Sequence, residues 1–213
     1  MKNITKEEFL EFAEEWRDNP PKSNEMKELV KCSYDEFLDF RIDYTHRFGF
    51  AIITKEFLDD CVSFLKEKKV LEVMSGSGYL AHLLQNNGID IIPTDNKKYA
   101  KSNFFNQWSN EYTEIEEIDA IEAIEKYHNT IDILLLSWPP YEDDTAYIIA
   151  ERCYKYNIPI LYIGELEYGC CADDDFFDFL ECAEESSILQ ENFVRFIGIY
   201  DNPLLYTFKK EGE

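Results

Sequence analysis

The sequence lacks any apolar run long enough to cross a membrane. Two of its longest apolar runs, at 133–136 and 158–163, fall far short of the roughly 18–20 residues that a membrane-spanning helix needs. The first residues, MKNITKEEFLEF, are charged and amphipathic and contain no apolar stretch typical of a secretory signal. We therefore predict a cytoplasmic protein that does not span a membrane.

Basic residues are also few. The chain has 21 Lys and Arg against 44 Asp and Glu, which gives a formal net charge of −23 at pH 7. Such a charge repels phosphate backbones at long range, so extended binding to nucleic acid is disfavoured unless a basic patch or a basic partner subunit overrides it. Solubility is the simplest reason for the acidity.

Patterns typical of a metal site are absent from the sequence. Its six cysteines include no CxxC pair, and its three histidines are scattered without helical ligand spacing. Reduced thiols in a cytosolic protein are the simplest interpretation. The adjacent Cys170 and Cys171 have no histidine nearby in the sequence to activate them, so we interpret both as small buried apolar residues. We predict no bound metal.

Apolar material for a core, in contrast, is plentiful. Hydrophobic residues make up 45% and aromatic residues 15% of the 213 residues, which suits one domain. Residues 1–47 have apolar side chains at three- and four-residue steps, as helices do. The Asn-Pro-Pro run at 19–21 ends the first helix, and Ser33 is the predicted N-cap of a helix that reaches about His46. We predict an N-terminal helical cap over residues 1–47.

From residue 69 onward, short apolar strands alternate with amphipathic helices. This alternation predicts an α/β fold, with a mostly parallel sheet and helices on both faces. The last two strands have no helix between them, so they predict an antiparallel hairpin at one edge. The predicted strands cover 70–74, 89–94, 115–118, 131–137, 159–163, 188–199 and 204–209, and the helices cover 79–85, 120–128, 146–154 and 173–185.

The first strand leads into a glycine loop that opens a helix. Gly76 and Gly78 allow a backbone to approach a ligand closely, and the helix N-terminus offers free N–H groups. The next strand ends at Asp95, and a carboxylate at that place commonly binds the hydroxyls of a ribose. A tight turn with a helix-capping aspartate is the structural alternative.

The segment VLEVMSGSGYLA resembles the first motif of the class I S-adenosylmethionine-dependent methyltransferases, in which a strand and an acid precede a Gly-x-Gly-x-Gly loop. Met74 replaces the first glycine. The resemblance covers most of residues 48–210 and implies a seven-stranded Rossmann-like domain over 48–213. It implies that Asp95 binds the ribose hydroxyls and that Asp119 and Ala120 contact the edge of the adenine. The implied cofactor-binding residues are Glu72, Met74, Ser75, Gly76, Gly78, Asp95, Asn96, Asp119, Ala120 and Ser137.

Further along, DILLLSWPPY at 132–141 resembles the fourth motif of the amino-methyltransferase branch, where a polar residue precedes Pro-Pro and an aromatic residue. In that branch the polar side chain and the first proline carbonyl accept hydrogen bonds from an amine, and the aromatic ring stacks on the substrate. Here Trp138, which has no acceptor oxygen, stands at the polar position. Either Ser137 replaces it, or the substrate is not an amine read in this way. Residues 48–58 resemble the segment that closes over the cofactor.

Glu165 follows the fifth predicted strand and should border the same crevice. It is equally open to a structural role and to binding an amine substrate or acting as a base. Tyr168 and Cys170 should lie near the rim, whereas the acids at 173–175 favour a helix N-terminus. We interpret Trp108, Tyr112, Phe176 and Phe177 as core. The predicted catalytic residues are Ser137, Trp138, Pro139, Pro140, Tyr141 and Glu165.

The resemblance thus implies a methyltransferase that uses S-adenosylmethionine and acts on a small molecule or a protein side chain, with nitrogen as a candidate acceptor atom. Three alternatives stay open. They are a non-catalytic binding or scaffold protein on the same fold, a sensor that binds the cofactor without transfer, and a methyltransferase of nucleic-acid bases.

Overall fold

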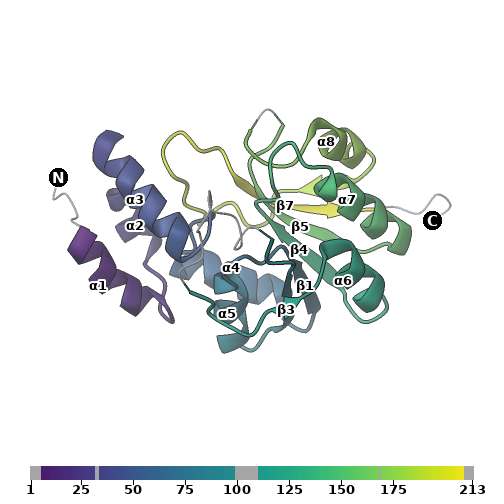
Figure 1. Cartoon of the computed structure of the whole chain (residues 1–213), viewed down its shortest axis with the longest axis horizontal. Helices are drawn as coiled ribbons and strands as arrows, with labels where there is room; N and C mark the ends of the chain where they lie inside the picture. The colour runs from purple at the N-terminus through teal and green to yellow at the C-terminus, as the bar shows by residue number, and fades with distance from the viewer. Residues whose placement is uncertain (1–5, 32–33, 99–109, 168, 209–213) are drawn as a thin grey trace.

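A computed structural model describes residues 6–31, 34–98, 110–167 and 169–208 (Figure 1). Three residues interpreted from the sequence, Ser33, Trp108 and Tyr168, lie outside this part of the chain. Within the described ranges, no helix combines the length and apolar character that crossing a membrane requires.

A seven-stranded sheet with the order β3-β2-β1-β4-β5-β7-β6 forms the centre of the fold. The pairs among β1 to β5 are parallel, and β7 runs antiparallel to both β5 and β6. This is the predicted Rossmann-like sheet with an antiparallel edge pair. Its strands are β1 (Lys69–Val73), β2 (Asp90–Asp95), β3 (Glu116–Glu117), β4 (Ile133–Ser137), β5 (Ile160–Gly164), β6 (Glu184–Ser186) and β7 (Asn202–Thr207).

Helices cover both faces of the sheet, because successive residues of its central strands point to opposite sides. In β4, Ile133 and Leu135 belong to one core cluster, and Leu134 and Leu136 to the other. Burying one such side chain contributes roughly 1.5–3 kcal/mol. The first cluster includes α4 (Lys55–Leu65) and α5 (Tyr79–Asn86), and the second includes α6 (Ala120–Tyr127), α7 (Thr145–Tyr156) and α8 (Asp174–Leu180).

Three N-terminal helices lie beside the sheet (Figure 1) and extend the first core cluster, α1 and α3 through aromatic contacts and α2 through Met26. They are α1 (Lys6–Trp16), α2 (Ser23–Leu29) and α3 (Tyr34–Arg47), of which α2 was not predicted as a separate helix. Trp16 of α1 and Tyr44 of α3 have ring centroids 6.5 Å apart, and Tyr44 lies 5.6 Å from Phe196 near the C-terminus. The Tyr79 hydroxyl donates to the Trp16 carbonyl at 2.6 Å. The helical character of the N-terminal segment is therefore confirmed where it is described; the domain division at residue 47 stays a prediction.

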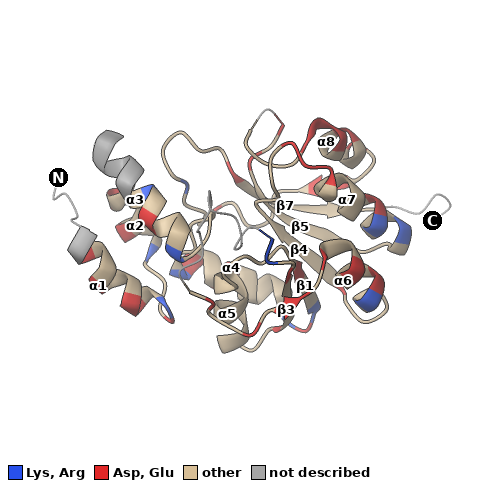
Figure 2. Cartoon of the chain, viewed as in Figure 1, with Lys and Arg blue, Asp and Glu red and all other residues tan. Residues whose placement is uncertain are grey.

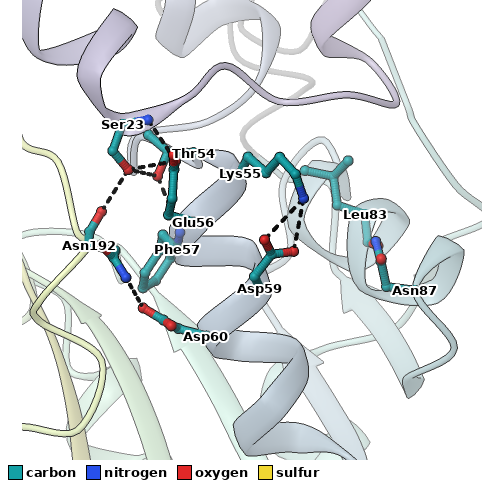
Figure 3. A network of polar contacts seen from close by, with 10 residues as sticks. All are labelled: Ser23, Thr54, Lys55, Glu56, Phe57, Asp59, Asp60, Leu83, Asn87 and Asn192. Carbon is teal, nitrogen blue, oxygen red and sulfur yellow. Dashed lines mark hydrogen bonds and ion pairs between the residues drawn. The ribbon is translucent and has the colours of Figure 1, made fainter.

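A polar network fastens α2 to α4 and to the segment before β7 (Figure 3). The Ser23 hydroxyl lies 2.9 Å from both Thr54 Oγ1 and Glu56 Oε2 and 3.3 Å from the Asn192 carbonyl oxygen. Asn192 in turn donates to Asp60 at 2.9 Å. Burial would raise the pKa of Glu56, but the hydrogen bonds from Ser23 prevail and lower it. The network fixes the N-terminal helices against the sheet domain.

Two predicted boundaries are wrong. The strand expected over 188–199 does not form: β6 is earlier and shorter, at Glu184–Ser186, and the helix expected to reach residue 185 ends at Leu180. The apolar residues at 188–199 have no alternation of period two. They pack instead as an irregular segment, and its buried members are Leu189, Phe193, Val194, Phe196 and Ile199.

Candidate active site

A cavity of about 440 Å³ opens at the carboxyl ends of β1, β2 and β4, where open α/β sheets bind ligands. We call one part the glycine-loop side, formed by Glu72, Met74, Ser75, Gly76, Asp95 and Asn96, and the other the proline-turn side, formed by Ser137, Trp138, Pro139, Pro140 and Tyr141. The remaining lining residues are Arg41, Phe48, Gly49, Phe50, Ala51, Ile53, Ser77, Tyr79, Leu80 and Cys170. Cys170 is exposed, so its interpretation as a buried residue is wrong, whereas Cys171 is buried.

The loop after β1 has the left-handed backbone of a glycine loop. Met74, Gly76 and Gly78 have φ of 56°, 57° and 69°. Met74 thus holds a left-handed backbone, at the steric cost that a side chain carries there. Gly76 lines the cavity, whereas a Cβ on Gly78 would lie 3.0 Å from Ile115 Cδ1. The left-handed backbone and this packing, and not the cavity, therefore favour glycine at 78.

Glu72 is a buried acid with a free oxygen at the base of the glycine-loop side. Its residue is 3% exposed, and Oε2 has no hydrogen-bond partner among the described residues. Burial raises the pKa of its carboxyl to about 8, and the negative charge of Asp95 adds to the rise. Glu72 therefore holds a proton at neutral pH, and a ligand cation would favour its ionised form.

Asp95 shapes the loop from the end of β2. Its Oδ2 accepts the Gly76 N–H at 3.0 Å, and its Oδ1 accepts the Lys97 N–H at 2.6 Å. Burial raises its pKa, although these two N–H bonds work in the opposite direction. Each carboxylate oxygen has a second lone pair, so Asp95 can hold the loop and still accept a bond from a ligand in the cavity.

Asp119 and Ala120 lie outside the cavity lining. Asp119 is the N-cap of α6, where its side chain accepts the Ile121 N–H at 3.1 Å, and Ala120 is buried. Asn96 connects Asp119 to the site, because Asn96 lines the cavity and its Nδ2 lies 3.4 Å from Asp119 Oδ2. A direct contact of Asp119 or Ala120 with a cofactor stays a prediction.

On the proline-turn side, Trp138 is held by bonds within the chain. It has a left-handed φ of 52° and donates its backbone N–H to the Ile163 carbonyl at 2.7 Å. Its ring stacks on Phe50 with centroids 5.3 Å apart and planes 21° apart. The ring Nε1–H donates to Asp201 at 3.2 Å. Trp138 is thus an oriented aromatic wall of the cavity.

The acceptor groups expected in the proline turn are partly engaged. The Pro139 carbonyl accepts the Ala172 N–H at 3.3 Å. Ser137 lines the cavity, and its hydroxyl can act there as an acceptor. Tyr141 also lines the cavity and is 58% exposed, so its ring is accessible to a substrate.

Glu165 lies next to this side but does not line the cavity. It is buried, and its two oxygens accept the N–H groups of Cys170 at 2.9 Å and Tyr200 at 2.8 Å. This arrangement joins the loop after β5 to the segment before β7. The structural interpretation therefore has the stronger support, and a catalytic role for Glu165 stays a prediction.

Sequence reasoning missed Arg41 and the buried Asp201. Arg41 lies on α3 and lines the cavity, but an arginine in an amphipathic helix carries no local signal of such a role. Phe50, in contrast, belongs to the 48–58 segment flagged by the resemblance, and its neighbours Phe48, Gly49, Ala51 and Ile53 also line the cavity. Among the residues with described positions, no group of three or more His, Cys, Asp or Glu is arranged to hold a metal ion.

Comparisons with known proteins give distant structural matches only. No family model and no curated protein sequence matches the chain. A magnesium protoporphyrin IX methyltransferase from Synechocystis PCC 6803 is 12% identical over 71% of this chain and 78% of its own, with a TM-score of 0.43. A SAM-dependent methyltransferase from Agrobacterium tumefaciens is 13% identical over 72% and 60%, with a TM-score of 0.42. A protein of the NADB-Rossmann superfamily from Streptococcus agalactiae is 12% identical over 76% and 71%, with a TM-score of 0.43. Likenesses this distant assign no function to the chain.

Proposed function

We propose that this protein is a methyltransferase that uses S-adenosylmethionine. One observation carries the proposal: a single cavity joins the glycine loop after β1, the carboxylate at the end of β2 and the SWPPY turn after β4. The first two features suit a nucleoside cofactor, and the third offers aromatic surface to an acceptor. The order of these motifs in the sequence is that of the family the sequence resembles.

The glycine-loop side would hold the cofactor. Asp95 would accept the ribose hydroxyls, and Gly76 would let the backbone approach the methionine part. Glu72, with its free buried oxygen, would face a positively charged group and ionise there. Asn96, with Asp119 and Ala120 behind it, would border the adenine, as the resemblance implies.

The cofactor supplies a methyl group on a positively charged sulfur. In the transfer, the sulfur–methyl bond would break with its electron pair staying on sulfur, a bond would form between the methyl and the acceptor atom, and the acceptor would lose a proton to solvent or to a base. The chain's own task is to align the acceptor with the methyl group and to exclude water. Trp138, Tyr141 and Phe50 supply the aromatic surfaces for this alignment, and Ser137 supplies a hydroxyl.

The acceptor is best sought among small molecules and protein side chains, with nitrogen as a candidate atom. Acidic side chains recur on α1, α6 and α8 (Figure 2), and the net charge of −23 opposes a grip on long nucleic acid. Methylation of nucleic-acid bases is therefore the weaker alternative and would need a basic partner.

A non-catalytic protein that binds the cofactor is the second candidate. It is favoured by a specific observation: Trp138 stands at the polar position of the motif, and the Pro139 carbonyl already accepts the Ala172 N–H at 3.3 Å. Both groups that would receive an amine are thus altered or engaged.

Calorimetry with S-adenosylmethionine and S-adenosylhomocysteine tests the proposal. We expect binding of both, with dissociation constants below roughly 100 μM. Binding of neither would overturn the proposal. Incubation with methyl-labelled cofactor and extracts separated into protein, nucleic acid and metabolite fractions then distinguishes the candidates, since label transferred to one fraction shows turnover and identifies the acceptor class. Binding without transfer to any fraction favours the non-catalytic protein.

A further inference from the structure

Arg41 has no acidic partner in the part of the chain that the structure describes, although the chain is strongly acidic. It lies on α3 and lines the cavity. Its guanidinium carbon is 5.9 Å from the centre of the Phe196 ring, and among the described residues no carboxylate pairs with it. The neighbouring Arg47 on the same helix, in contrast, pairs with Glu14. A guanidinium that keeps its donors free at a cavity is available to bind an anion.

Arg41 lines the same cavity as Cys170 and Tyr141, and its charge reaches the proline-turn side. The positive charge of Arg41 acts on the Cys170 thiol, where it partly offsets the rise in pKa caused by burial and Glu165. Cys170 in turn acts on the Tyr141 hydroxyl, and all three residues line the cavity. Cys170 follows β5, whereas Asp95 ends β2, and both β1 and β4 lie between those strands. Three strand spacings of about 4.8 Å thus separate β2 from β5.

The walls between Arg41 and the glycine loop are aromatic. Phe50 and Trp138 stack on each other, and Tyr141 presents an accessible ring. Such walls favour a flat apolar body. The net charge of −23 repels a polyanion, but one arginine matches one carboxylate, which it can bind through two parallel N–H donors.

On the basis of the proposed function, we propose that the methyl acceptor is a small aromatic carboxylic acid whose carboxylate binds Arg41 while its ring packs against the stacked pair of Phe50 and Trp138, beside Tyr141. This arrangement would point the opposite end of the acceptor toward the glycine-loop side. Arg41 would then determine the specificity of the site and take no part in the transfer itself.

Matched pairs of acids and uncharged amides test this role. The probes are anthranilate and anthranilamide, salicylate and salicylamide, and nicotinate and nicotinamide, titrated by calorimetry into the full chain saturated with S-adenosylhomocysteine. We expect at least one acid to bind about tenfold or more tightly than its amide, the factor given by one charge-assisted pair. Arg41→Ala should remove that difference and leave the affinity for S-adenosylhomocysteine unchanged. Arg41→Lys should retain part of it, and Arg47→Ala should behave as wild type.

Three outcomes would overturn the proposal. The first is that no acid in the set binds or that acids and amides bind alike. The second is that Arg41→Ala lowers the affinity for S-adenosylhomocysteine but not the affinity for its decarboxylated analogue. Arg41 would then bind the carboxylate of the cofactor. The third is that the wild type binds neither S-adenosylmethionine nor S-adenosylhomocysteine, in which case the proposed function fails as well. In the first two outcomes the proposed function stands.

Discussion

The two sides of the cavity differ in how far their polar groups are bonded within the chain. On the glycine-loop side, Glu72 Oε2 and the Ser75 hydroxyl are buried without a partner among the described residues. On the proline-turn side, the Trp138 ring N–H, its backbone N–H and the Pro139 carbonyl all have partners. The unbonded polar atoms of the first side are buried, whereas those at the second, the Ser137 hydroxyl and the Arg41 guanidinium, belong to half-buried residues beside an aromatic surface fixed by bonds within the chain.

This difference indicates that the glycine-loop side offers buried acceptors to the hydrogen-bond donors of a ligand. A buried polar atom without a partner costs about 1–3 kcal/mol, and a ligand that bonds to it recovers that cost. The proline-turn side has fewer unpaired buried atoms whose cost a ligand could offset. It can instead bind a ligand through its shape and through aromatic stacking. Both sides share one feature: Met74 and Trp138, each directly after a strand, hold a left-handed backbone that the surrounding structure must enforce.

The largest effect should follow from Gly76→Val, which fills the glycine-loop side. Gly76 has φ of 57° and lines the cavity, so a branched side chain both strains the loop and occupies the place of the ligand. We expect no measurable binding of S-adenosylhomocysteine by calorimetry. Gly88→Val is the matched control, because Gly88 has φ of 81° and open space around it. Equal binding by both variants would show that the loop is only a turn.

Asp95→Ala should have the next largest effect on binding. Hydrogen bonds from cofactor hydroxyls to a carboxylate contribute about 1.5–3 kcal/mol each, so we expect an affinity for S-adenosylhomocysteine at least about tenfold lower. Asp173→Ala is the control. Asp173 caps α8 by accepting the Phe176 N–H at 3.0 Å, and its loss should cost about 1 kcal/mol of stability without changing the affinity. A folded Asp95→Ala chain with wild-type affinity would remove Asp95 from the site.

The glycine-loop side could be predicted closely because its signals are local. A buried strand, a glycine loop and a strand-end acid lie within one stretch of sequence, and β1 and β2 bring Glu72 and Asp95 to the same edge. The sequence could not reveal that Gly78 serves packing against Ile115. That contact depends on a residue far along the chain, near β3, which no local pattern connects to the loop.

Tyr141→Ala tests the proline-turn side and should have a smaller effect. If Tyr141 stacks on the acceptor, its loss removes about 0.5–1.5 kcal/mol beyond area burial, which lowers turnover about two- to tenfold. The affinity for S-adenosylhomocysteine should stay the same. Turnover is measured on the acceptor class found with labelled cofactor, with Tyr154→Ala, an exposed tyrosine on α7, as the control. A Tyr141→Ala chain that melts much earlier but turns over normally would make the turn structural.

The proline-turn side was harder to predict because long-range contacts complete it. The SWPPY motif identified the turn, but Arg41 comes from α3, and Asp201 comes from just before β7. The segment at 188–199 looked like a strand from its apolar content, yet the Ser23 network (Figure 3) and the aromatic cluster around Tyr44 engage it as an irregular segment. Tertiary packing decided its conformation.

Asp201→Asn should have the smallest effect on ligand affinity. It tests whether the buried carboxyl that bonds to Trp138 contributes to the pH dependence of stability. Asp201 is 2% exposed and accepts the Trp138 Nε1–H at 3.2 Å. Burial raises the pKa of its carboxyl to about 6, although the Trp138 bond and the Arg195 charge oppose the rise. An unfolded aspartate has a pKa of about 3.9. The folded chain therefore binds more protons between about pH 4 and pH 6, and the free energy of unfolding falls as the pH rises through that window.

Asparagine keeps an acceptor for the Trp138 N–H but does not titrate. The variant should therefore lose part of this pH dependence. The free energy of unfolding of the variant minus that of wild type should be larger at about pH 7.5 than at about pH 4.5. The dependence is reduced and not removed, because Glu72, with a pKa of about 8, acts in the same direction and remains. Urea unfolding at the two pH values measures the change, and calorimetry should give an unaltered affinity for S-adenosylhomocysteine. A variant with the full wild-type pH dependence would show that Asp201 is ionised throughout, and the bond to Trp138 would then be to a charged group that the fold stabilises by other means.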